Sequence, residues 1–163
     1  AGGSLREEIG RGHFVFPDQF IDFTRFRKVS FFETFPEDDL HHTPMADPFS
    51  RDITDKLIES AQDMGIPFHE KGTLITIEGP RFSTRAESNM FRACGADMIN
   101  MSTAPEVVLA NEIGIPYAAV AMSTDYDCWK TDEAPVTWEE VLKVFNKNVN
   151  KVIDLLHYTI AKF

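Results

Sequence analysis

The sequence predicts an α/β fold, with a mixed, largely parallel sheet flanked by helices. Three observations indicate this class: helix-like stretches alternate with short apolar segments, a helix-capping motif recurs, and glycines stand where helices should end. Helices that alternate with apolar strands are typical of parallel strands joined by helical crossovers. The 163 residues are expected to form a single domain over residues 1–163.

The first part of the chain predicts extended structure followed by a long loop. Residues 13–22 are expected to be an extended segment that Pro17 interrupts. Residues 33–48 are polar, acidic and proline-containing, so they should form a loop. Because most connections have about 4–6 residues, this longer loop is interpreted as a functional or interface loop.

From residue 50 onward the pattern is regular. A helix is predicted that Ser50 caps and Gly65 ends, and residues 72–79 predict the strand that follows it. The apolar face of this helix consists of Ile53, Leu57, Ile58, Ala61 and Met64.

Three copies of the S/T-x-x-E capping box predict three further helix starts. The pairs are Thr84 with Glu87, Thr103 with Glu106, and Thr137 with Glu140. Gly95 and Gly114 should end the first two of these helices, and the apolar segments 96–101 and 115–122 predict buried strands. The last helix should run to about residue 161 and pack on the sheet. Its apolar face comprises Val141, Leu142, Phe145, Val149, Val152, Ile153 and Leu156.

Composition and charge argue against several classes of protein. The formal net charge of −10 leaves no basic stripe for a nucleic-acid partner. No apolar run approaches the roughly 20 residues that span a bilayer, and residues 1–10 lack the apolar core of a signal peptide. Cys94 and Cys128 are too few for a disulfide framework, so a cytoplasmic location is expected.

Polar clusters follow the predicted strands, at the sheet edge where α/β proteins bind ligands. Asp125 and Asp127 follow the apolar run 115–122 and are candidates for a ligand site. A solvated turn is the ordinary alternative for this pair, because loops are rich in Asp. Arg81, Phe82 and Ser83 precede a helix and could bind a planar base and an anion. The alternative for them is a capped helix entry with Phe82 in the core.

The remaining candidates are weaker. Ser102 and Thr103 precede a helix, so N-capping is their ordinary role and an anion site is the alternative. His41 and His42 suggest a metal, but adjacent histidines point in different directions and no further ligands stand at a suitable spacing, so no metal is expected. No motif of a nucleophilic hydrolase occurs.

Several stretches together carry a more specific signal. EGPRFSTRAE (78–87), INMSTAPEVVLA (99–110) and AMSTDYDCW (121–129) resemble the 5′-methylthioadenosine phosphorylases, a branch of the purine nucleoside phosphorylase family. GSLREEI (3–9), DQFID (18–22) and PMADPF (44–49) are similar to that family too. The resemblance implies a nucleoside phosphorylase-like fold and a pentosyltransferase. Such an enzyme uses inorganic phosphate as co-substrate, and no cofactor, to convert 5′-methylthioadenosine to adenine and 5-methylthioribose 1-phosphate.

The resemblance also implies roles for individual residues. Asp125 and Asp127 would be the catalytic acids that meet the 6-amino group and N7 of the purine, with Asp125 protonated. Relatives that use 6-oxopurines carry Asn in place of the first acid. The other implied substrate-binding residues are Phe82, Ser83, Ile99, Asn100, Met101 and Thr124 around base and ribose, Val141 and Leu142 at the 5′-methylthio group, and His42 across a trimer interface. Ser102 and Ala1 would bind phosphate.

The chain departs from the family pattern at three places. Ser102 stands where the family usually has Thr, and Trp138 stands where a smaller aliphatic residue is usual. The family's first strand, glycine-rich turn and Arg-His pair do not lie ahead of Ala1, so the fold is expected to be the C-terminal two-thirds, incomplete at the N-terminus. Two alternatives therefore stay open: a broader purine nucleoside phosphorylase acting on adenosine or inosine, and a catalytically incompetent nucleoside-binding or trimerisation fragment.

Overall fold

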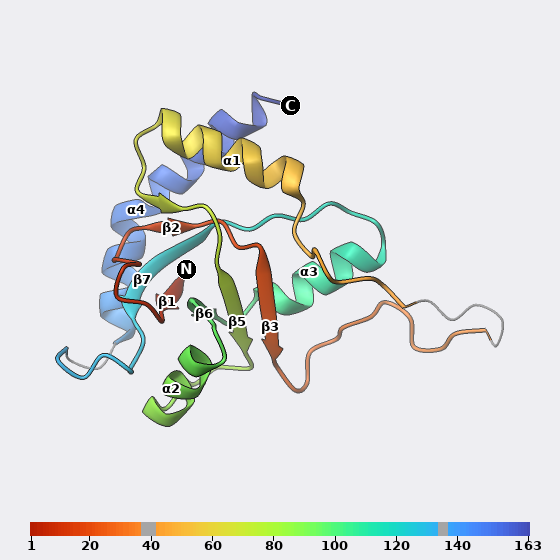
Figure 1. Cartoon of the computed structure of the whole chain (residues 1–163), viewed down its shortest axis with the longest axis horizontal. Helices are drawn as coiled ribbons and strands as arrows, with labels where there is room; N and C mark the ends of the chain where they lie inside the picture. Colours follow the sequence, from red (N-terminus) through yellow and green to blue (C-terminus); the bar gives the residue numbers. More distant parts are fainter. Residues whose placement is uncertain (37–41, 134–136) are drawn as a thin grey trace.

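The computed structural model describes residues 1–36, 42–133 and 137–163, and in this part of the chain seven strands form one sheet (Figure 1). The strands are β1 (Gly2–Ser4), β2 (Phe14–Val15), β3 (Gln19–Phe23), β4 (Phe68–His69), β5 (Thr73–Ile77), β6 (Met98–Asn100) and β7 (Ala121–Tyr126). The helices are α1 (Arg51–Asp63), α2 (Arg85–Ala93), α3 (Thr103–Glu112) and α4 (Trp138–Ile160).

The sheet is mixed and largely parallel, which confirms the predicted fold class. Its strand order is β3-β5-β6-β1-β7-β2-β4. The pairs β3–β5, β5–β6, β1–β7 and β2–β4 are parallel, whereas β1–β6 and β2–β7 are antiparallel. The short strand β1 lies at the centre of the sheet, so its residues contact strands on both sides.

Two of the three predicted capping boxes are confirmed. Both reciprocal hydrogen bonds form at Thr84 before α2 and at Thr137 before α4. The box predicted at Thr103 is wrong: Ser102 is the N-cap of α3, and the Thr103 hydroxyl instead accepts a hydrogen bond from Asn100 Nδ2 at 2.6 Å. Ser50 is the N-cap of α1 as predicted, but its side chain makes no capping bond.

The predicted helix ends are confirmed by backbone geometry. Gly65, Gly95 and Gly114 have φ values of 63°, 89° and 72°, in the left-handed region that follows many helices. The strands that Pro17 separates, β2 and β3, are confirmed as well, and the described parts of residues 33–48 contain neither helix nor strand.

The strand predicted at 115–122 is displaced toward the C-terminus. Residues 115–120 have no regular structure, because the neighbouring strands lie opposite residues 121–126 instead: Ala121 and Met122 pair with β2, and Ser123, Asp125 and Tyr126 pair with β1. Asp125 therefore lies inside β7, and Asp127 directly after it.

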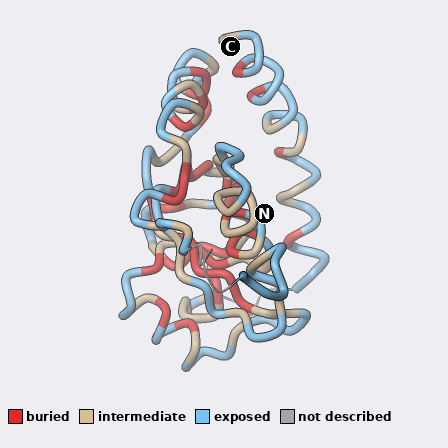
Figure 2. Tube along the Cα trace, turned by 90° about the vertical axis from the view of Figure 1, so that its right-hand side faces the viewer, coloured by how far each residue is buried: buried red, intermediate tan, exposed pale blue. Residues whose placement is uncertain are grey.

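Buried residues of the helices and the sheet, drawn in red in Figure 2, form the core. α4 packs against β7 and α1, and α3 packs against β3 and β5. The broad apolar face predicted for α4 is only partly covered: Val141 is buried, whereas Leu142, Ile153 and Leu156 are exposed. Leu155, which was not part of the predicted face, is fully buried. Within the described residues, none of the helices has the length and apolar character that crossing a membrane requires.

Candidate functional site

A pocket of about 220 Å³ lies where β1, β6, β7 and the start of α4 meet. The predicted site residues that line it are Ala1, Phe82, Ser83, Ile99, Asn100, Met101, Ser102, Thr124, Asp125, Asp127 and Val141. The structure thus brings together segments that are far apart in the sequence. Gly2, Gly3, Ile77 and Trp138 also line the pocket and were not among the predicted site residues.

Two glycines in β1 allow this strand to lie close to both of its neighbours, β6 and β7. Gly3 pairs with Asp125, and a Cβ atom on Gly3 would lie only 3.0 Å from Asp125 Oδ2. A Cβ atom on Gly2 would lie 2.5 Å from the carbonyl oxygen of Ile99 in β6. The close approach of β1 to β6 therefore requires glycine at position 2, and at position 3 a side chain would crowd the Asp125 carboxylate.

Asp125 and Asp127 form the floor of the pocket, with 8% and 7% of their surface exposed. The Thr124 hydroxyl donates to Asp125 Oδ1 at 2.7 Å, and the Ser83 hydroxyl donates to Asp127 Oδ2 at 2.6 Å. Each acid thus has one oxygen held by a hydroxyl group. A solvated turn, the alternative considered for this pair, does not describe two side chains as buried as these.

Burial raises the pKa of Asp125 above its ordinary value. The Thr124 hydrogen bond opposes this rise, and the nearby carboxylate of Asp127 adds to it. A proton would therefore neutralise Asp125 at a higher pH than an ordinary Asp. A protonated carboxyl group can donate a hydrogen bond to a ligand on the floor of the pocket.

The mouth of the pocket is aromatic. Phe82 is 46% exposed, so the alternative that placed it in the core is wrong. Arg81 does not line the pocket, because its guanidinium forms two hydrogen bonds, of 2.7 and 2.8 Å, with the carboxylate of Glu87. The anion-binding role considered for Arg81 therefore has no support from its position.

A second, apolar hollow of about 380 Å³ adjoins the pocket under α1 and α4. Ala1, Asn100 and Ser102 line both. The hydroxyl of Ser102 is not used to cap α3, so it is available at the boundary between the two spaces. Asn100 Oδ1 accepts a hydrogen bond from Thr76 at 2.9 Å, which fixes the amide at the end of β6.

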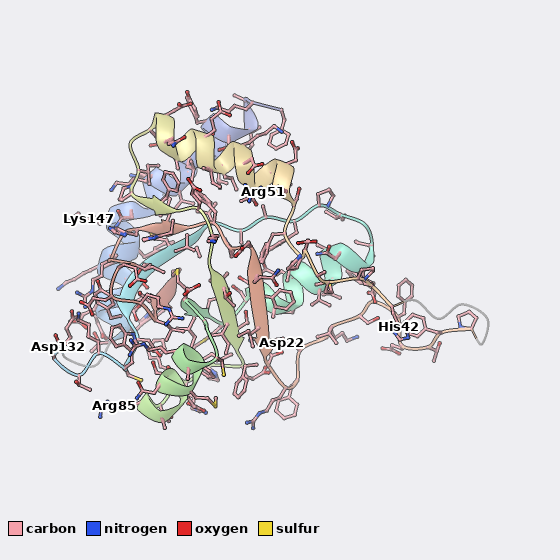
Figure 3. The ribbon with its side chains drawn as sticks, viewed as in Figure 1. Asp22, His42, Arg51, Arg85, Asp132 and Lys147 are labelled. Carbon is pink, nitrogen blue, oxygen red and sulfur yellow. The ribbon has the colours of Figure 1, made fainter. Side chains whose placement is uncertain are left out.

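Two predicted site residues lie elsewhere. Leu142 follows Val141 on α4 but is exposed and does not line the pocket, because successive residues of a helix point in different directions. His42 lies on the arm formed by residues 24–36 and 42–48, which extends away from the sheet (Figures 1 and 3). Its neighbour His41 lies outside the described residues.

Comparison with protein families gives one match that covers nearly the whole chain. Residues 1–161 match the family described as the phosphorylase superfamily. S-methyl-5′-thioadenosine phosphorylase of Xenopus tropicalis is 52% identical over 158 residues, which are 96% of this chain and 56% of that protein. The enzyme of the same name from Anopheles gambiae is 51% identical over 163 residues, or 99% of this chain and 59% of that one. The chain thus spans somewhat more than half the length of these curated relatives.

Solved structures show the same likeness. A variant of adenosine/methylthioadenosine phosphorylase from Schistosoma mansoni in complex with adenine is 39% identical and superposes with a TM-score of 0.91, covering 99% of this chain and 63% of that one. A second variant, in complex with methylthioadenosine, gives a TM-score of 0.89 at 38% identity, covering 98% of this chain and 61% of that one.

Proposed function

The chain belongs to the phosphorylase superfamily, and we propose that it carries the purine and ribose side of a site that cleaves 5′-methylthioadenosine with inorganic phosphate. The products would be adenine and 5-methylthioribose 1-phosphate. The observation that carries the proposal is the pair of buried acids, Asp125 and Asp127, on the floor of a pocket with an aromatic mouth. The names of the relatives and the adenine and methylthioadenosine bound to the Schistosoma enzyme support it.

Cleavage of the N-glycosidic bond leaves negative charge on the purine and positive charge on the ribose. A protonated Asp125 that donates to N7 would stabilise the departing base, and Asp127 would accept from the 6-amino group. The raised pKa of Asp125 supports this assignment, because it favours the protonated form. Phosphate would balance the charge on the ribose and then attack C1′.

The other residues take roles by position. Phe82 would stack near base and ribose, and Ser83 would hold Asp127 in place through its hydrogen bond. Ser102 and Ala1, at the boundary between pocket and hollow, would donate to phosphate. No cofactor is needed for this reaction, and phosphate is its co-substrate.

Assembly and location complete the proposal. We infer a homotrimer in which the arm meets a second copy and His42 covers the neighbour's 5′ site. The arm is attached to the sheet by hydrogen bonds from the backbone of Arg25 and Phe26 to Glu78, yet Phe26, Phe31 and Phe32 expose their rings. Exposed aromatic side chains in one segment favour an interface.

The cytoplasm is the proposed location, since both cysteines are free thiols.

Adenosine is a second candidate substrate, because the Schistosoma relatives carry adenosine as well as methylthioadenosine in their names. Comparing adenine release from methylthioadenosine, adenosine and inosine at saturating phosphate decides between the narrow and the broad specificity. The two acids at the base edge favour the 6-amino substrates over inosine.

We expect the 163-residue chain to bind adenine and methylthioadenosine weakly and to release adenine at a negligible rate. Among the described residues that line the pocket and the hollow, none is an Arg or Lys that could hold a phosphate dianion. Calorimetry measures the binding, chromatography measures adenine release with and without phosphate, and light scattering on the same sample measures the assembly.

The native protein, whose intact mass would be determined first, should release adenine only when phosphate is present. Absence of adenine binding by the 163-residue chain, or turnover by it at an ordinary enzyme rate of about 1–10³ s⁻¹, would contradict the proposal. If the native protein binds nucleosides but releases no adenine, the chain is a binding module instead.

A further inference from the structure

The pocket has a polar floor and an aromatic mouth, and these differ sharply in exposure. Asp125 and Asp127 on the floor are less than one-tenth exposed, whereas Phe82 and Trp138 are 46% and 60% exposed. A purine whose amino edge meets the acids must therefore lie deepest. The sugar and its 5′ substituent then extend toward the mouth, where Trp138 is the largest side chain.

A helix start fixes the backbone position of Trp138. Trp138 is the first residue of α4, directly after the N-cap Thr137. The capping box that joins Thr137 and Glu140 has both of its hydrogen bonds at 3.3 Å, which anchors this first turn. Val141 lies one turn further on the same side of α4 and also lines the pocket. Trp138 and Val141 together make one apolar wall.

The space beside this wall is small. A volume of about 220 Å³ lies below the roughly 300–1,000 Å³ of sites that take drug-sized ligands. An indole at the mouth therefore leaves little room for a long chain on the 5′ atom. An aromatic ring also makes favourable contacts with a thioether sulfur. That sulfur needs no hydrogen bond, so an apolar wall suits it.

We propose that Trp138 is a specificity-determining residue that closes the mouth of the pocket and limits the 5′ substituent to short, uncharged groups such as methylthio. This inference rests on the proposed function, since it requires a purine nucleoside whose base lies against the two acids. Removing the indole should open the mouth to longer 5′-alkylthio chains, while the base site stays in place.

The test compares dissociation constants of the 163-residue chain for 5′-methylthioadenosine and 5′-n-butylthioadenosine, with adenine as a measure of the base site. We expect the preference for the methylthio over the butylthio compound to fall about tenfold in Trp138→Val, within the ~10–200-fold range that one methylene decides in an apolar pocket. The preference of Trp138→Phe should lie between that of the unaltered chain and that of Trp138→Val. Glu139→Ala, an exposed position in the same helical turn, is the matched control and should keep the original ratio.

Each outcome decides something. A ratio that falls in Trp138→Val and stays in Glu139→Ala supports the inference. An unchanged ratio in Trp138→Val, in a chain that still binds adenine, overturns the inference and leaves the proposed function standing. If the unaltered chain binds neither adenine nor the nucleosides, the proposed function fails and this inference fails with it.

Discussion

Replacing Asp125 by Asn should move the base preference of the pocket from adenine toward hypoxanthine by about tenfold or more. The Thr124 hydroxyl donates to Asp125 Oδ1, so an amide at this position keeps its oxygen on that side. Its NH₂ group then takes the place of Oδ2 and faces the base as a double donor. N7 and O6 of hypoxanthine both accept, whereas the 6-amino group of adenine would face a second donor.

The expected size of this change follows from the free-energy cost of leaving a buried polar group without a hydrogen-bond partner. A buried donor or acceptor without a partner costs about 1–3 kcal/mol, and about 1.4 kcal/mol corresponds to a tenfold change in affinity. Competition binding with adenine and hypoxanthine measures the ratio. Asp132→Asn, the same substitution in the exposed loop after β7 (Figure 3), is the matched control. If the ratio of adenine to hypoxanthine affinity is equal in both variants and in the unaltered chain, Asp125 is not the group that distinguishes the two bases.

Adenine affinity should fall as the pH rises through the raised pKa of Asp125, by up to about tenfold per pH unit. Below that pKa the carboxyl group is protonated and donates to N7. Above it the carboxylate has no proton to donate and its charge faces the N7 lone pair, so binding weakens. The window begins above the ordinary value of 3.8, because burial shifts the pKa upward. Calorimetric titrations at a series of pH values give the slope.

Two controls separate this effect from other titrations. In Asp125→Asn the amide does not titrate, so the affinity should lose the slope. 7-Deazaadenine carries a C–H group in place of N7 and gives Asp125 nothing to donate to, so its affinity should not follow the same curve. If adenine affinity is flat across the range, or rises with pH, Asp125 does not act through its proton.

Local signals in the sequence were sufficient for most of the fold. The capping boxes at Thr84 and Thr137 and the helix-ending glycines depend on a few neighbouring residues, so they could be read from the chain alone. The strand predicted at 115–122 failed because strand limits depend on partners: β1 and β2 lie opposite 121–126. The capping box predicted at Thr103 was wrong for a similar reason, because the Thr103 hydroxyl accepts a hydrogen bond from Asn100 instead.

The site was predictable in its position and less so in its details. Asn100, Asp125 and Asp127 do line one pocket, but the expected reason is wrong, because β6 and β7 run in opposite directions on either side of β1 and their carboxyl ends do not meet at one edge. The short strand β1 between them is what brings these side chains close together. Arg81 could not be excluded beforehand, because its pairing with Glu87 depends on side-chain geometry. The spacing of three residues between Trp138 and Val141 is the signal that could have brought Trp138 into the predicted site. His42 lies on the arm, away from the pocket, so its predicted role depends on the proposed trimer.

The most direct measurement is the ¹⁵N resonance of adenine labelled at N7, recorded free and bound to the 163-residue chain. The central claim is that a protonated Asp125, buried beside Asp127, donates a hydrogen bond to N7 of the base. We expect the N7 resonance to shift on binding to the unaltered chain and to stay near its free value when adenine is bound to Asp125→Ala. An N7 resonance that does not move on binding, or that moves equally in the Ala variant, would contradict the account.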